Sequence, residues 1–217
     1  MIRLNVVVEG QTERAFVQGV LRPFLWESDI HASPLIVRTS RESVGGVVTY
    51  GKVRRLMVSW MKQQPTTTFT TMFDLYALPS DWPSPAASNC GHDAHEFAEQ
   101  VEQAMCEDID HWRFIPYVQV HEFEALLLVE PSALLKPHPD ARDAVSALEE
   151  AVAECGGPEL VNDGPETHPS QRIERLIPRY KKALHGPQAA RAIGIDRMRD
   201  SCPHFNEWIE RLIELAP

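Results

Sequence analysis

Near its start, the chain has a short apolar run that ends on a carboxylate. Residues 4 to 8 are apolar apart from one asparagine, which is typical of a strand covered on both faces in a parallel sheet. Glu9 follows directly, and Gly10 permits a sharp turn because it has no Cβ. Apolar residues then recur at helical spacing over residues 15–21, and Thr12 can cap that helix. The pattern therefore predicts a strand, a turn and a helix, with a carboxylate at the carboxyl end of the strand.

The same alternation continues to about residue 135. Short apolar runs predict further strands over residues 34–37, 66–75 and 114–121. Amphipathic stretches predict helices over residues 52–63 and 93–109, and another from residue 122 onwards. Strands that alternate with helices indicate an α/β fold, in which a mostly parallel sheet of about four strands has helices on its faces.

Beyond residue 135 the strand pattern stops. Helices are expected over residues 140–154, 170–184, 188–193 and 203–215. We therefore expect an α/β core over residues 1–135 and a helical C-terminal subdomain over residues 136–217, packed on that core.

Composition narrows the class of protein. The formal net charge of −10 argues against a protein that coats nucleic acid without specificity. Neither a run of eighteen apolar residues nor a signal-peptide pattern is found, and the four cysteines are scattered. A cytoplasmic protein with reduced thiols is expected, with no membrane association.

Three of the predicted strands are followed by acidic residues. Glu9 follows the first strand, Asp74 lies at the end of the third, and Glu122 and Glu124 follow the fourth. Parallel strands would bring these carboxylates to one edge of the sheet, where a cation such as Mg²⁺ would relieve their repulsion. The alternative is that they cap helices or pair with lysine and arginine. His121, beside them, is either a proton shuttle or a histidine packed at a strand end.

Several motifs resemble those of a known family. Residues 8–13 read VEGQTE, residues 72–79 read MFDLYALP, and residues 116–127 read PYVQVHEFEALL. This order is similar to that of a prokaryotic family of unknown function, classed as TOPRIM-like and related to the nuclease domains of overcoming-lysogenization-defect (OLD) proteins. The resemblance continues to residues 202–208 (CPHFNEW) and so covers nearly the whole chain.

The resemblance implies phosphodiester chemistry that depends on Mg²⁺ or Mn²⁺. Glu9 matches the single glutamate of the TOPRIM motif, expected to be a metal ligand or the general acid/base. Asp74 matches the first acid of an Asp-x-Asp pair, but Tyr76 stands where the second should be. Asp81, Glu122 or Glu124 could substitute, or the site could bind without catalysis. Relatives encoded beside ATPases and connected with phage defence imply a partner ATPase.

A basic stretch supplies the expected substrate contacts. Residues 170–199 hold eight lysines and arginines and two acids. Arg172, Lys181 and Lys182 are the residues expected to grip a phosphate backbone, although solvated helix charges are the simpler interpretation for each one. The preferred hypothesis is a metal-dependent nuclease, with DNA favoured over RNA, whose catalytic residues are Glu9, Asp74, Glu122 and His121. The alternative is a catalytically degenerate adaptor or binding subunit.

Overall fold

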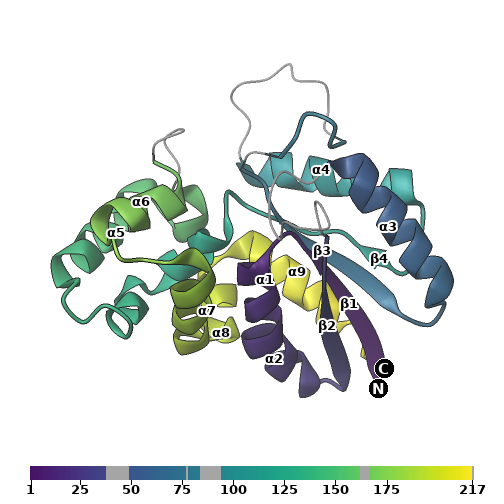
Figure 1. Ribbon diagram of the computed structural model, residues 1–217, viewed down its shortest axis with the longest axis horizontal. Helices are drawn as coiled ribbons and strands as arrows, with labels where there is room; N and C mark the ends of the chain where they lie inside the picture. Colours follow the sequence, from purple (N-terminus) through teal and green to yellow (C-terminus); the bar gives the residue numbers. More distant parts are fainter. Residues whose placement is uncertain (38–48, 77, 84–93, 162–166, 217) are drawn as a thin grey trace.

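A computed structural model describes residues 1–37, 49–76, 78–83, 94–161 and 167–216. Its centre is a parallel sheet in the order β2-β1-β3-β4, with the short strand β5 also paired to β3. Figure 1 shows this sheet with helices on both of its faces, so the expected α/β class is confirmed. The strands are β1 (Ile2–Val8), β2 (Ile30–Ile36), β3 (Thr68–Asp74), β4 (Phe114–Ile115) and β5 (Val118–Gln119).

Side chains of β1 enter two separate hydrophobic clusters because successive residues of a strand point to opposite faces. Val6 and Val8 belong to the larger cluster, whereas Val7 belongs to the smaller one. All three are fully buried. This burial explains why the run is apolar throughout rather than alternating.

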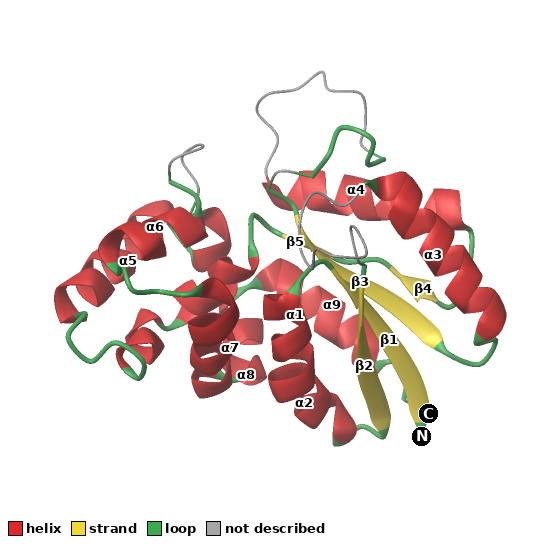
Figure 2. Cartoon of the chain, viewed as in Figure 1, coloured by secondary structure: helices red, strands yellow, loops and turns green. Residues whose placement is uncertain are grey.

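Helices α3 (Tyr50–Gln63) and α4 (Ala94–Ile109) cover the face that holds Val7. The opposite face is covered by α1 (Gln11–Phe16), a π-helical turn (Val17–Leu21), α2 (Arg22–Trp26) and α9 (Pro203–Ile213). Figure 2 shows these helical layers above and below the strands.

The start of the first helix differs from the prediction. Gly10, not Thr12, occupies the N-cap position, and its N–H donates to the Glu13 carboxylate at 2.9 Å. Thr12 is instead buried within the first turn. The prediction was wrong because glycine can also take the cap position when an acid three residues later accepts its N–H.

Strand β2 starts at Ile30, four residues before the predicted strand. It contains Pro34, which pairs in register with Val6. Because β2 pairs only with β1 among the described strands, it forms an edge of the sheet, where a proline is tolerated.

The predicted fourth strand is split in two. Pro116 separates β4 from β5 because proline has no N–H to donate to the ladder. The Thr71 hydroxyl bridges the break: it donates to the Tyr117 carbonyl and accepts the Tyr117 N–H, both at 2.9 Å. The helix expected from residue 122 is a 3-10 helix, η2 (Phe123–Val129), with Glu122 at its N-cap position.

The C-terminal part is helical, as expected, but its helices are divided differently. The segment 170–184 is two helices, α6 (Pro169–Leu176) and α7 (Lys182–Ile193), because Pro178 cannot continue α6. The prediction of one helix that carries Arg172 and both lysines was therefore wrong. The remaining elements are η3 (Pro131–Leu135), α5 (Arg142–Cys155), η4 (Pro158–Leu160) and α8 (Ile195–Ser201).

One hydrophobic cluster joins the first and last parts of the chain. It contains Val6 of β1, Leu126 of η2 and Trp208 of α9. The division at residue 135 stays a prediction, while the packing shows that the C-terminal helices share the core of the sheet. Among the helices of the described ranges, none combines the length and the apolar character needed to cross a membrane.

Candidate metal centre

Two adjacent strands and the segment after β5 deliver carboxylates to one end of the sheet. Val8 is in register with Met72, so Glu9 leaves β1 beside the last residues of β3, which end on Asp74. The Phe123 N–H donates to Asp74 Oδ1 at 2.9 Å. This bond ties the strand end to the segment that carries Glu122 and Glu124. The four predicted metal ligands are thus brought together.

Glu13 adds a fifth carboxylate that the sequence analysis missed. It is buried in the first turn of α1, and the charges of Asp74 and Glu124 act on it. The signal was present in the VEGQTE motif, since an acid three places after a glycine N-cap faces back toward the strand end. Glu9, Glu13, Asp74, Glu122 and Glu124 are called the acidic cluster below.

Among the described residues, one lysine lies within the acidic cluster. Lys182, the first residue of α7, places its Nζ 2.9 Å from Glu124 Oε2 and 3.3 Å from Asp74 Oδ2. Burial acts to lower the pKa of Lys182, but the charges of Asp74 and then of Glu124 raise it above its usual value. This lysine was predicted to bind substrate from an exposed helix; in the structure its ammonium is an integral part of the cluster.

One ammonium does not balance the negative charge. Burial and then the charge of Asp74 raise the pKa of Glu9 to about 7 and that of Glu13 to about 8. Burial raises the pKa of Glu124 to about 7 and also raises that of Asp74, although Lys182 opposes both shifts. Burial first, and then repulsion between the carboxylates, therefore favours the protonated form of several of these groups near neutral pH.

Glu122 is the exception in the acidic cluster. Burial acts to raise its pKa, but the charge of Lys182 and hydrogen bonds from Ser170 and His168 lower it below its usual value. Its Oε2 accepts the Ser170 N–H at 2.9 Å and lies 3.0 Å from His168 Nδ1. Glu122 is thus held ionised by Lys182 of α7 and by the hydrogen bonds at the start of α6.

Tyr76, at the position of the missing second acid, packs beside this contact. Its ring stacks on the His168 ring with centroids 4.3 Å apart. The Tyr76 N–H also donates to the His121 carbonyl at 2.8 Å. Tyr76 therefore supports the histidine that contacts Glu122 rather than supplying a ligand.

Helix α7 approaches the acidic cluster very closely. The Tyr180 hydroxyl donates to Glu124 Oε1 at 3.2 Å. A Cβ on Gly186 would lie 3.0 Å from the Tyr180 hydroxyl oxygen and 3.2 Å from the Phe123 ring. The lack of a side chain at Gly186 avoids these tight contacts and so favours the position from which α7 holds Lys182 against the carboxylates.

His121 lies at the edge of the cluster with a left-handed backbone (φ 57°). Burial and the neighbouring charge of His95 lower its pKa, and its ring donates to the backbone of Glu159. A non-glycine residue in this conformation is held there by its surroundings. Its predicted role in proton transfer stays a prediction.

The other predicted side chains take different places. Arg172 Nε donates to the Thr167 carbonyl at 2.7 Å. Lys181 is exposed and lines a hollow of about 710 Å³ with Arg179 and His185. Asp81 is exposed and accepts the Gly51 N–H at 3.3 Å, at the start of α3. Among the predicted basic residues, Lys182 is thus the one paired with the carboxylates in the described structure.

The donor chemistry of the acidic cluster fits a hard divalent cation. Mg²⁺ and Mn²⁺ prefer oxygen ligands, and carboxylates are the oxygen donors gathered here. A cation would also offset the effect of burial, and the smaller repulsion by neighbouring carboxylates, that raise the pKa values of Glu9, Glu13 and Glu124. The types of donor gathered here are therefore the ones that such an ion prefers.

Three comparisons with known proteins were made, with solved structures, with curated proteins and with protein-family models. It is similar to the C-terminal region of the OLD protein of Xanthomonas campestris pv. campestris, at 17% identity and a TM-score of 0.49, over 99% of this chain and 94% of that one. For the C-terminal region of the Burkholderia pseudomallei OLD protein, the identity is 14% and the TM-score 0.47, over 100% of both chains. The comparison with curated proteins gave no match. A family model described as "Domain of unknown function (DUF4276)" matches residues 8–213, and the chain therefore belongs to the DUF4276 family.

Proposed function

We propose that this protein is a divalent-metal-dependent nuclease that cleaves nucleic-acid phosphodiesters. The observation that carries the proposal is the acidic cluster, in which the Lys182 ammonium contacts Asp74 and Glu124 and its charge also acts on Glu9, Glu13 and Glu122. Glu9, Asp74, Glu122 and Glu124 would hold Mg²⁺ or Mn²⁺, and Glu13 lies close enough to adjust the charge of the site.

The bound ion would activate water and stabilise the negative charge that develops on the phosphate. Glu9 is suited to proton transfer because its side chain is half-buried and its pKa is near 7. Glu122 is held ionised and is suited to bind the cation. The Lys182 ammonium can attract a phosphate oxygen at the same place.

Substrate and partner follow from the motifs and the charge distribution. The motif resemblance to OLD-type nucleases supports DNA over RNA as substrate, and it supports a partner ATPase and a role in phage defence. On a chain with a net charge of −10, the basic stretch 170–199 is the place to bind a backbone. Arg172 and Lys181 belong to that stretch and remain our proposed phosphate contacts.

The first experiment is a calorimetric titration with Mn²⁺ of the wild type and of the Glu9→Gln/Asp74→Asn variant. Both changes keep the side-chain shape and a hydrogen-bond acceptor, so the Phe123 N–H stays bonded. We expect saturable binding in the wild type and at least about tenfold weaker binding in the variant. Cleavage of labelled DNA and RNA with Mg²⁺ or Mn²⁺ should be lost in parallel.

The matched control is Asp143→Asn/Glu150→Gln, which removes the same charges from exposed positions on α5. It should bind Mn²⁺ and cleave like the wild type. Equal Mn²⁺ binding by the wild type and Glu9→Gln/Asp74→Asn would contradict the proposal.

A second candidate function is a non-catalytic adaptor that works through a partner. Two observations favour it: Lys182 already supplies a cation to Asp74 and Glu124, and Tyr76 stands in place of an acid. An adaptor should show neither Mn²⁺-dependent cleavage nor any loss of partner binding in the Glu9→Gln/Asp74→Asn variant.

A further inference from the structure

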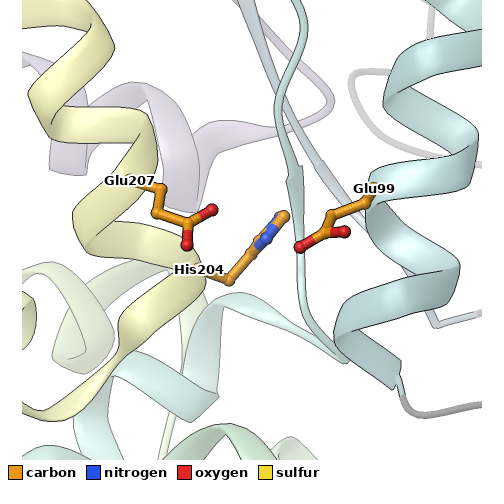
Figure 3. Close-up of side chains that lie close together, drawn as sticks. All are labelled: Glu99, His204 and Glu207. Carbon is orange, nitrogen blue, oxygen red and sulfur yellow. The ribbon is translucent and has the colours of Figure 1, made fainter.

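A second group of possible ligands lies between α4 and α9. His204 and Glu207 come from the first turns of α9, and Glu99 comes from α4. One ring nitrogen of His204 and one oxygen of each glutamate all lie within 4.8 Å of one another. Figure 3 shows the imidazole between the two carboxylates.

The hydrogen bonds of His204 determine which nitrogen carries its proton. Nε2 lies 2.9 Å from Glu102 Oε1 and 3.1 Å from the Val118 carbonyl oxygen. The carbonyl oxygen of Val118 can only accept a hydrogen bond. Glu102 Oε1 also acts as an acceptor, since it already accepts the Val118 N–H. Nε2 of His204 must therefore be the donor. In the neutral imidazole Nδ1 is then the nitrogen with a free lone pair.

Within the part of the chain that the structure describes, that second nitrogen has no hydrogen-bond partner. His204 is 4% exposed, and its Nδ1 is buried without a hydrogen bond among the described residues. A buried polar atom without a partner is unfavourable and calls for an explanation such as an ion. A metal at Nδ1 would complete the common arrangement in which a carboxylate, here Glu102, orients a metal-binding histidine from its far side.

We propose that Glu99, His204 and Glu207 form a second divalent-metal site that favours Zn²⁺. Imidazole nitrogen and carboxylate oxygen are both zinc ligands, and a zinc site with three protein ligands keeps a fourth position for water. An imidazole also disfavours Mg²⁺, which prefers oxygen ligands alone. Both glutamates are exposed, so their side chains can close on the ion and water can complete its shell.

The site would join two helices that are distant in sequence. Helix α4 covers one face of the sheet and α9 the other, and His204 meets Glu102 where the two approach. A bound ion would therefore fix α9 against α4 and stabilise the folded chain, because the unfolded chain lacks the assembled ligands.

The acidic cluster could bind the same ion, so the test uses the Glu9→Gln/Asp74→Asn background. The second site shares no residue with that cluster, and failure of one proposal leaves the other intact. Burial acts to lower the pKa of His204, but the hydrogen bond to Glu102 raises it above its usual value. Zn²⁺ is therefore titrated by calorimetry at about pH 8, because metal binding requires the deprotonated ligands, and Tm is measured with and without Zn²⁺.

Within that background, Glu99→Gln/Glu207→Gln is compared with Glu107→Gln/Glu210→Gln. The control residues are exposed carboxylates on the same two helices, so the change in charge is identical. We expect the control to bind Zn²⁺ with a rise in Tm. The Glu99→Gln/Glu207→Gln variant should bind at least about tenfold more weakly and show no such rise.

Two results would overturn this inference. One is equal Zn²⁺ affinity and equal Tm shift in the two variants. The other is no saturable Zn²⁺ binding by the control, which would mean that Nδ1 of His204 carries a proton rather than a metal ion.

Discussion

Glu13 combines a structural and an electrostatic role in one side chain. Its Oε2 accepts the Gly10 N–H and so closes the first turn of α1. Burial and the charge of Asp74 raise its pKa to about 8. The group that caps the helix is therefore also a group whose ionisation is opposed by the folded structure.

This raised pKa predicts an unusual dependence of stability on pH. The folded pKa values of Glu9, Glu13 and Glu124 lie near 7 to 8, above the ordinary value of 4.5. Between those values the folded state binds more protons than the unfolded state, so the free energy of unfolding should fall as pH rises from about 5 to 8. The free energy of unfolding is measured by urea denaturation at a series of pH values, without divalent ions.

Glu13→Gln provides the control for the pH effect. The amide oxygen can still accept the Gly10 N–H, but it does not titrate. The loss of stability with rising pH should therefore be smaller in this variant. A wild-type stability that increases steadily from pH 5 to 8 would contradict the prediction, and added Mg²⁺ should diminish the loss at pH 8.

The break between β4 and β5 depends on one hydroxyl. Thr71 replaces the ladder bonds that Pro116 interrupts, and it is fully buried. Thr71→Val would leave the N–H and the carbonyl of Tyr117 without partners, which should lower the free energy of unfolding by about 2 to 4 kcal/mol. Urea denaturation should show a lower midpoint, with no change in the slope of the unfolding free energy against urea concentration.

Thr71→Ser keeps the hydroxyl and loses only a methyl group, worth about 0.8 kcal/mol. The serine variant should therefore be clearly more stable than the valine variant. Equal stability of the two would show that the hydroxyl does not support the break.

The sequence predicted those helices and strands that depend on the pattern of neighbouring residues. The apolar run at residues 4–8 and the spacing within residues 52–63 were enough to predict β1 and α3. Parallel strands also implied that Glu9 and Asp74 would lie near each other. The effects of Pro116 and Pro178 were equally local but were missed, because the apolar pattern continues across both residues.

Contacts between distant segments could not be predicted in the same way. The pairing of Lys182 with Asp74 and Glu124 depends on how α7 packs against η2, and Gly186 favours this packing because a Cβ there would lie only 3.2 Å from the Phe123 ring. Likewise, nothing local in the sequence connects His204 with Glu102. Tertiary packing determined these sites, and the sequence pattern specified only their residue types.

Trp208 connects α9 to the sheet. It is 1% exposed, its Nε1 donates to Thr70 Oγ1 at 2.8 Å, and its ring stacks on Tyr117 with centroids 4.1 Å apart. Trp208→Ala should lower the free energy of unfolding by about 3 to 5 kcal/mol. Because one cluster joins the early and late parts of the chain, circular dichroism and fluorescence should report a single transition.

Trp112→Ala is the matched control because Trp112 is 84% exposed. Its effect should stay within about 0.5 kcal/mol. Two separate transitions in the Trp208→Ala variant would instead indicate that the C-terminal helices unfold independently of the sheet.

Pro34 in the edge strand β2 affects whether two molecules can pair through the edges of their sheets at high concentration. An open strand edge offers its unpaired N–H and carbonyl groups to a strand of another chain, which is a common route to aggregation. Pro34 lies in the middle of β2 and has no N–H. A second chain would find the row of donors interrupted there, so this edge is protected against sheet-to-sheet aggregation.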